Sequence, residues 1–441
     1  MSLLPRTPTT SFNPSEVTGS VHVPMAAPAW RKALMVCGPA LLVSVGYVDP
    51  GNWATDLAAG TQFGYDLLCI IFLSNIAAIF LQTLTMRVGV VTGKDIARLS
   101  RDTFPRHLNI FFWLLAELAI IACDIAEVLG SALALHLLFG CSIATGIVIT
   151  ALDTVIVLGL RGRGYRQIEA IILGLLLTIG ICFTAELIIA SPDWPEVFKH
   201  VVPSFEAVGS SERLYLAIGI IGATVMPHNL YLHSSLVQTR KFEQHDAARK
   251  DIIFFNTIDT AVALFVAFLI NAAILILSAA AFHGTDAAQN VTGIEDAYKL
   301  LEPVLGSTFA MYAFGISLWA SGQSSTFTGT IAGQVILEGY MQFKIPAWIR
   351  RFITRGLALI PALIGVLILG DKGVDWLLVL SQVILGLQLP FVIYPLLRFA
   401  SNKNLMGAFV AGWKTQAAAW LLFSVLTCAN LWLLYQLAFE S

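Results

Sequence analysis

Eleven long apolar stretches limit this chain to a helical membrane fold. A helix needs about 20 residues to cross roughly 30 Å of hydrocarbon, and each stretch is close to that length or longer. Hydrophobic residues make up 57% of the chain and charged residues only 12%, which excludes a soluble protein. We expect membrane spans at residues 33–60, 66–92, 108–138, 142–160, 167–190, 213–237, 251–281, 302–338, 348–370, 374–398 and 411–438.

The polar segments between these spans are too short to form a domain. The longest connections, about 191–212, 238–250 and 282–301, cannot bury a core of their own. We therefore expect one membrane domain over 33–441. Residues 1–32 are rich in Pro, Ser and Thr and lack an apolar core preceded by positive charge, so we expect a disordered cytoplasmic tail there and no signal peptide.

Net charge and cysteine spacing give no sign of nucleic-acid binding, disulfide bonds or a thiolate metal site. The formal net charge of -2 gives no reason to expect nucleic acid, and nothing in the sequence calls for a cofactor or an obligate protein partner. The cysteines lie in or at the ends of apolar spans without C-x-x-C spacing, which indicates packing residues, not disulfides or a thiolate metal site. They are Cys37, Cys69, Cys123, Cys141, Cys182 and Cys428.

The basic residues indicate how the chain crosses the membrane, because Lys and Arg are retained on the cytoplasmic side. With eleven spans and a cytoplasmic N-terminus, 22 of the 26 Lys and Arg residues fall inside and 4 outside. The four outside are Lys199, Arg213, Lys299 and Lys372. We therefore predict a multi-pass protein of the cell membrane with its C-terminus outside.

Two spans are interrupted at their middles. The first breaks at "DPGN", Asp49 to Asn52, and the sixth contains "GATVMPHN", Gly222 to Asn229. Two broken helices five spans apart are typical of an inverted five-plus-five repeat. Proline removes a backbone donor, so carbonyls near Gly46 or Tyr47, and near Ala223, lose their helical partners. In hydrocarbon such carbonyls need another partner, and a bound cation can be that partner.

The side chains at the two breaks favour a soft cation. Asp49 and Asn52 offer oxygen ligands, and Met226 offers a thioether sulfur. A thioether binds Mg²⁺ or Ca²⁺ poorly but binds softer transition ions, so the set favours Mn²⁺, Fe²⁺, Co²⁺ or Cd²⁺. The alternative is that Met226 only fills space, as most membrane methionines do.

At these residues the sequence resembles the Nramp family of divalent-metal transporters. "DPGN" and "MPHNLYLHS" are similar to the paired metal-binding motifs of that family. "ASGQSSTFTGTIAGQVILEGYM" in span eight looks like its transport signature, and "AELAIIACDIAEVLGSALAL" looks like its third span. The resemblance covers the chain from about residue 33 to its end.

The resemblance implies an all-α LeuT-type fold, with spans one to five and six to ten as inverted repeats. It also implies proton-coupled import of Mn²⁺ or Fe²⁺. The implied metal ligands are the side chains of Asp49, Asn52 and Met226 and the backbone carbonyl of Ala223. A carbonyl of Gly46 or Tyr47 and the side chain of Gln382 would join in some conformations.

Span three carries three acids on one helical side, at positions i, i+7 and i+10. They are Glu117, Asp124 and Glu127. Acids in a span usually face water or basic partners. By resemblance, Asp124 and Glu127 extend a proton path from Asp49 toward the cytoplasm, where Arg350 and Arg351 are expected to pair with them. A purely structural ion-pair network is the alternative.

Further polar residues of the spans are given smaller roles. His228 is expected to contribute to proton coupling or hydration, and His233 is a second candidate. Glu169 and Asn271 are expected to act in structure or gating.

Three residues depart from the family pattern, namely Gly46, Trp53 and Asp56. We expect the Asp56 carboxylate near the external mouth, where it would affect cation selectivity.

Other functions fit the sequence less well. A magnesium-selective relative would lack the thioether, and a sodium-coupled amino-acid symporter on the same fold would not need it. A metal-sensing receptor would need a soluble output domain. The chain contains no H-E-x-x-H, G-x-S-x-G or Walker sequence, so neither an enzyme nor an ATP-driven pump is expected.

Overall fold

The computed structural model is almost entirely helical. It describes residues 18–24, 26–152, 165–203, 209–286, 291, 293–342, 347–370 and 372–439. The long helices are α4 (Leu68–Thr92), α6 (Arg106–Phe139), α9 (Tyr165–Ala190), α13 (Asp246–Phe282), α15 (Thr308–Met341), α16 (Ala347–Leu369), α17 (Lys372–Ala400) and α19 (Trp413–Phe439).

Both predicted breaks are present. The first span consists of α2 (Pro39–Gly46) and α3 (Pro50–Phe63), and the sixth consists of α11 (Ser211–Thr224) and α12 (Pro227–Leu236). Each second half begins with a proline at its first position, where the missing N–H would have no helical partner anyway. Proline therefore ends one half-helix and starts the next.

Eight helical stretches among the described residues are long and apolar enough to cross a membrane. The three other predicted spans differ for separate reasons. The first is divided into two short halves, and the fourth contains α7 (Ile143–Thr150), after which residues 153–164 lie outside the described part. The eighth, α15, is long but rich in Ser, Thr and Gly. The count of eleven spans stays a prediction.

Part of the expected N-terminal tail has regular structure. Residues 1–17 lie outside the described residues, but Val21–His22 form strand β1 and α1 covers Ala29–Val36. β1 pairs in parallel with β2 (Arg240–Lys241), which follows α12 and the short 3-10 helix η2 (Val237–Thr239). The tail is therefore attached to the segment that follows the second break.

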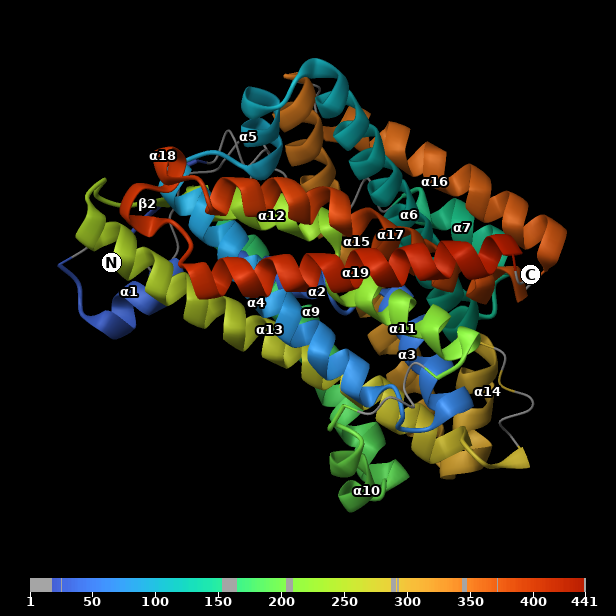
Figure 1. Ribbon diagram of the computed structural model, residues 1–441. Helices are drawn as coiled ribbons and strands as arrows, with labels where there is room; N and C mark the ends of the chain where they lie inside the picture. The colour runs from blue at the N-terminus through green and yellow to red at the C-terminus, as the bar shows by residue number, and fades with distance from the viewer. Residues whose placement is uncertain are drawn as a thin grey trace.

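Short helices connect the spans. They are α5 (Ile96–Thr103), α10 (Trp194–Lys199), α14 (Ile294–Leu305), α18 (Lys403–Met406) and the 3-10 helix η4 (Gly407–Phe409). In Figure 1, α5 and α10 lie at opposite ends of the bundle.

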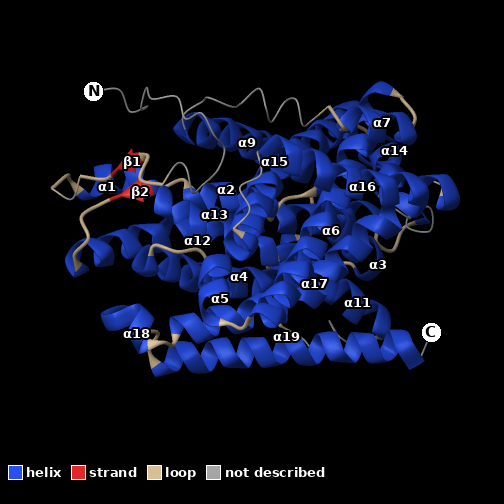
Figure 2. Cartoon of the chain, turned by 90° about the horizontal axis from the view of Figure 1, so that it is seen from above, coloured by secondary structure: helices blue, strands red, loops and turns tan. Residues whose placement is uncertain are grey.

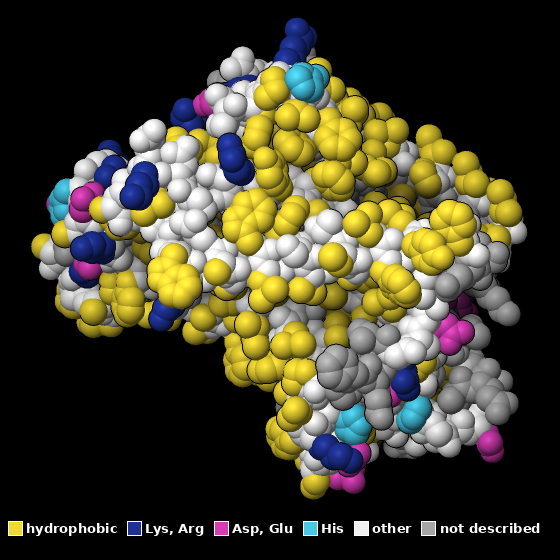
Figure 3. Space-filling model, viewed as in Figure 1, with side chains coloured by type: hydrophobic (Ala, Val, Ile, Leu, Met, Phe, Trp, Pro, Cys, Tyr) yellow, Lys and Arg dark blue, Asp and Glu magenta, His cyan; other side chains and the backbone are white. Residues whose placement is uncertain are grey.

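The broken helices lie inside the bundle. α3 packs along α13 and α11, and α12 packs on α4 and α15. α6 and α15 form a long central contact, whereas α19 lies along one edge beside α17 and α11 (Figure 2). On the face seen in Figure 3, hydrophobic side chains cover most of the surface, and Lys and Arg gather near α1, α5 and α18. This arrangement leaves an apolar outer belt for lipid and encloses the polar breaks.

Candidate metal site

The two helix breaks are in direct contact. The Asn52 side chain donates from Nδ2 to the carbonyl oxygen of Ala223 at 3.1 Å, which joins the first break to the second. The same Nδ2 donates to Oδ1 of Asp49 at 2.8 Å. The predicted oxygen ligands from the two halves of the chain therefore meet at one point.

Asp49 keeps one carboxylate oxygen available. Asp49 is the N-cap of α3, and its Oδ1 accepts hydrogen bonds from the backbone N–H and the Nδ2 of Asn52. Its Oδ2 is buried and has no hydrogen-bond partner among the described residues. A buried carboxylate oxygen without a donor is costly, so this oxygen is suited to a cation.

Met226 lies at the second break, as the N-cap residue of α12. The side chain is fully buried and packs against Ala119 of α6 and Leu385 of α17. Nδ2 of Asn229 donates toward the Met226 sulfur at 3.5 Å. A side-chain atom at position 46 would collide with this amide, so Gly46 makes room for it. Asn229 thus orients the sulfur, a role that sequence reasoning missed although Asn229 lies in the motif.

The carbonyls freed by the first break already have partners. Nδ2 of Asn271 in α13 donates to the Tyr47 carbonyl at 2.8 Å, and the Ser321 hydroxyl donates to the Val48 carbonyl at 2.5 Å. The Gly46 carbonyl accepts from the Asp49 N–H at 3.4 Å. In this structure, polar side chains from α13 and α15 therefore supply partners for the carbonyls that the broken helix leaves free.

Gln382 lies beside the first break. It is buried on α17 and packs directly against Gly51, where a Cβ atom would collide with its amide. Its Nε2 donates to the Ser381 hydroxyl at 2.9 Å, and its Oε1 has no hydrogen-bond partner among the described residues. This oxygen is a further candidate ligand, and it comes from a helix outside the two breaks.

The acids of α6 pair differently from the prediction. Arg350 donates to both carboxylate oxygens of Glu117, at 3.0 and 2.9 Å, and Trp113 also donates to Glu117. Asp124 and Glu127 are fully buried, and Oε2 of Glu127 lies 3.8 Å from Nη1 of Arg355. Arg350 was expected beside Asp124 or Glu127, but Arg355, five residues further along α16, is the arginine that approaches Glu127. The Arg351 side chain lies outside the described part.

Glycines of the span-eight signature make room for these pairs. A Cβ at Gly329 would lie 2.7 Å from Oε1 of Glu127, and one at Gly333 would lie 2.8 Å from Nη2 of Arg350. Both distances are too short for a real contact. The spacing of these two glycines by one helical turn therefore lets α15 pack against α6 and α16 without displacing the charged side chains.

The two histidines have separate environments. Nε2 of His228 lies 3.7 Å from the sulfur of Cys123. Nδ1 of His233 lies 2.9 Å from Oε1 of Gln82, whose Nε2 donates to the Tyr47 hydroxyl at 2.8 Å. Each histidine therefore connects α12 to a different helix, His228 to α6 and His233 to α4.

Asp56 is not at an open mouth. It is 1% exposed, and α3 is enclosed mainly by α13, α11 and α17. One turn earlier, the Trp53 ring packs against Phe183 and Phe314, with ring centroids 4.8 and 5.1 Å away. The expectation of an external Asp56 is wrong for this conformation.

Known proteins with similar sequences show the family to which the chain belongs. A family model described as "Natural resistance-associated macrophage protein-like" (Nramp) matches residues 40–436. The chain belongs to the Nramp family. It is 56% identical to the divalent metal cation transporter MntH of Ralstonia nicotianae and to MntH 1 of Pseudomonas aeruginosa, in each case over 98% of both chains.

Solved structures of this Nramp fold are similar over most of the chain. A crystal structure of a mutant of the Eremococcus coleocola manganese transporter has a TM-score of 0.88 and 37% identity, and the match covers 96% of this chain and 90% of that one. Mhp1, a nucleobase-cation-symport-1 family transporter, has a TM-score of 0.58 at 16% identity, which shows a shared fold alone. The predicted LeuT-type architecture is confirmed.

A buried ion pair holds the start of half-helix α2. Arg240 donates to Oε1 of Glu169 at 2.9 Å and to the carbonyls of Val36 and Cys37 at 3.1 and 2.6 Å. Asp259 of α13 accepts from the N–H groups of Gly38 and Ala40. These contacts fasten the junction of α1 and α2 to α9 and α13.

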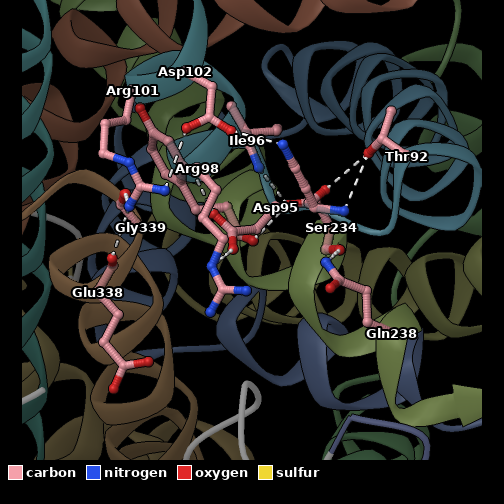
Figure 4. A network of polar contacts seen from close by, with 12 residues as sticks. Thr92, Asp95, Ile96, Arg98, Arg101, Asp102, Ser234, Gln238, Glu338 and Gly339 are labelled. Carbon is pink, nitrogen blue, oxygen red and sulfur yellow. Dashed lines mark hydrogen bonds and ion pairs between the residues drawn. The ribbon is translucent and has the colours of Figure 1, made fainter. Parts of the chain in front are cut away.

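A second polar network fastens α5 to the neighbouring Nramp helices (Figure 4). The Ile96 N–H donates to the Ser234 hydroxyl at the end of α12, and Arg101 donates to the Gly339 carbonyl of α15 at 2.6 Å. Asp95 caps α5 and pairs with Arg98 at 3.1 Å. Burial raises the pKa of Asp95 above its usual range, although Arg98 partly offsets the shift.

Proposed function

We propose that this protein is a secondary transporter that imports divalent transition metals with protons. The observation that carries the proposal is the buried Oδ2 of Asp49, which has no hydrogen-bond partner in the described part of the chain and lies where the two broken helices meet. Mn²⁺ and Fe²⁺ are the proposed substrates, with Cd²⁺ and Co²⁺ as further ions. The relatives named MntH are described as divalent metal cation transporters, in agreement with this substrate class.

The proposed ligands are Asp49, Asn52, Met226 and the Ala223 carbonyl, joined by the carbonyl of Gly46 or Tyr47 and by Gln382. In this structure Nδ2 of Asn52 donates to both Asp49 and Ala223. A cation would replace that amide N–H, and the Asn52 side chain would turn its oxygen toward the metal. Asn271 would then give up its 3.2 Å contact with Oδ1 of Asn52.

Selectivity would come from the Met226 sulfur. Mg²⁺ prefers oxygen ligands and loses its water shell reluctantly, whereas Mn²⁺ and Fe²⁺ accept a thioether more readily. Because Met226 is fully buried between α6 and α17, its sulfur would meet the ion without competing water.

Proton movement would follow the acids of α6. A cation beside Asp49 favours the ionised carboxylate, so binding would release its proton. We propose Asp124 and Glu127 as the next proton carriers, with His228 assisting. Glu117, Arg350, Arg351 and His233 are assigned supporting positions on this route. The proposed orientation places the N-terminus and α5 in the cytoplasm and the C-terminus outside, in the cell membrane.

Uptake into proteoliposomes tests the function. We expect Mn²⁺ uptake that excess Mg²⁺ does not inhibit, together with acidification of the vesicle interior. The Met226→Ala variant should lose this discrimination against Mg²⁺. Met86→Ala is the matched control, because Met86 is equally buried but packs in a separate cluster with Val90 and Ile252. Equal competition by Mg²⁺ in the unaltered protein would contradict the selectivity, and Mn²⁺ influx without proton influx would contradict coupling.

A further inference from the structure

Cys123 contacts two polar side chains of the proposed transport route at once. It lies on α6 and is 3% exposed. Its sulfur is 3.7 Å from Nε2 of His228 on α12 and 3.6 Å from Oε1 of Glu127 on α6. Both distances are within the range of hydrogen bonds to sulfur, which are longer than those to oxygen. The thiol therefore does more than fill space, the role that the sequence suggested.

One assignment of hydrogens uses all three groups. A thiol has a single hydrogen and is also a weak acceptor. The Cys123 S–H donates to the Glu127 carboxylate. The sulfur then accepts from Nε2–H of His228, which leaves Nδ1 of His228 as a bare acceptor. Nδ1 is buried and has no hydrogen-bond partner among the described residues. In this tautomer Nδ1 carries no hydrogen, so no buried N–H of His228 is left without an acceptor.

These contacts form part of a longer chain between helices. His228 lies two residues after Met226, at the start of α12. Glu127 lies 3.8 Å from Arg355 of α16, which in turn donates to the Thr150 carbonyl of α7 at 3.3 Å. Cys123 thus stands between the broken helix that holds the proposed sulfur ligand and the charged pair of α6 and α16.

A metal-binding role for the thiol does not fit the geometry. No group of three or more His, Cys, Asp or Glu side chains among the described residues is arranged to hold a metal ion. The contacts of Cys123 are instead those of a hydrogen-bonding bridge.

We propose that Cys123 is a positioning residue that transmits movement of the α12 break to Glu127. When a cation draws Met226 toward Asp49, His228 moves with it, and the thiol carries that displacement to the carboxylate that serves the proton route. The inference rests on the proposed proton-coupled metal import. It adds a residue that determines how tightly the two fluxes are linked.

Substitution of the thiol tests the bridge. In proteoliposomes with Mn²⁺ outside, we expect Cys123→Ala and Cys123→Val to lower the ratio of proton to Mn²⁺ influx about fivefold, the effect of losing one hydrogen bond. Cys123→Ser keeps a donor and an acceptor, so it should restore most of the ratio. Cys69→Ala is the matched control, because Cys69 is also buried but contacts the Asp66 carbonyl. An unchanged ratio in both the Ala and Val variants would overturn the proposal, as would an equal loss in the control.

Infrared spectroscopy of the S–H stretch provides a readout independent of transport. The sample is the full chain with Cys123 as its only cysteine. We expect a band at the frequency of a hydrogen-bonded thiol that moves toward the free-thiol frequency in Glu127→Ala and changes again on adding Mn²⁺. A free-thiol band in the unaltered site would overturn the bridge even if transport is intact. If Mn²⁺ uptake or proton influx is absent from the wild type, the proposed function fails, while this band still reports the contacts.

Discussion

The amide nitrogen of Asn229 lies 3.5 Å from the sulfur of Met226 and orients it at the meeting point of the two broken helices. The amide itself is held against Gly46 and the Val43 carbonyl of α2. A residue of the second break is therefore positioned by the first half-helix, which makes the geometry of the sulfur dependent on how the two halves dock.

Asn229→Ala should weaken metal binding without unfolding the protein. Loss of a group that orients a ligand commonly lowers metal affinity about 10- to 100-fold, and we expect a tenfold or larger decrease for Mn²⁺. Titration calorimetry on the purified protein measures this affinity. Asn256→Ala removes a buried amide of α13 that donates to the Ile252 carbonyl of the same helix, and serves as the control. Wild-type affinity in Asn229→Ala would show that the sulfur needs no such support.

Gly333→Ala should destabilise the contact between α15 and α16. The added Cβ would stand 2.8 Å from Nη2 of Arg350 and displace its pair with Glu117. Overpacking of this kind costs about 1–3 kcal/mol, so a lower melting temperature is expected in detergent. Gly356→Ala on α16 is the control, because its added Cβ would meet no atom within 4 Å, and the substitution should be neutral or slightly stabilising. Equal melting temperatures for the two variants would contradict this interpretation.

Arg240→Ala should release the start of α2. Removing one partner of a buried ion pair costs about 3–5 kcal/mol, because the Glu169 carboxylate stays buried without the Arg240 guanidinium. The Cys37 and Val36 carbonyls also lose their donor. The test uses a chain in which Cys37 is the only cysteine. We expect maleimide to label Cys37 at least about tenfold faster in the Arg240→Ala variant than without that substitution. A tenfold change corresponds to about 1.4 kcal/mol, which is part of the expected destabilisation.

The control for this release is Arg249→Ala, since Arg249 pairs with the exposed Asp246 at the start of α13. Exposed pairs contribute little to stability, so labelling of Cys37 should be unchanged. Unchanged labelling in Arg240→Ala as well would mean that Asp259 alone holds the junction.

Asp95 and Asp102 should affect stability with opposite dependence on pH. Burial raises the pKa of Asp95, so the folded protein binds this proton more tightly than the unfolded chain. Its contribution is therefore greatest below the ordinary carboxyl pKa and declines as pH rises through the raised value. We expect the melting temperature of wild type minus that of Asp95→Asn to decrease as pH rises through this range.

Asp102 supplies the matched comparison on the same helix. Burial alone would raise the pKa of Asp102, but the Lys94 and Arg101 side chains bring it below its usual range. Its contribution is present above the ordinary carboxyl pKa and is lost as pH falls through the lowered value. The difference between wild type and Asp102→Asn should thus increase as pH rises. Slopes of the same sign for the two variants would contradict these assignments.

The sequence alone determined the features that depend on residues adjacent along the chain. Apolar runs predicted the spans, and Pro50 and Pro227 predicted the breaks, because a proline disrupts its own helix whatever surrounds it. The identities of Asp49, Asn52 and Met226 predicted a soft-cation site for the same local reason. Their five-span separation indicated an inverted repeat in which the two breaks meet, and resemblance to the Nramp family implied the same.

Only the tertiary structure decided which side chains meet across helices. Arg350 pairs with Glu117 while Arg355 approaches Glu127, and Asn271 and Ser321 reach carbonyls of the first break from α13 and α15. Cys123 contacts His228 across 105 positions of the chain. Such pairs depend on the rotation and depth of each packed helix, and a shift of one turn changes every partner. Hydropathy and spacing contain no measure of that rotation, so these contacts required the packed structure.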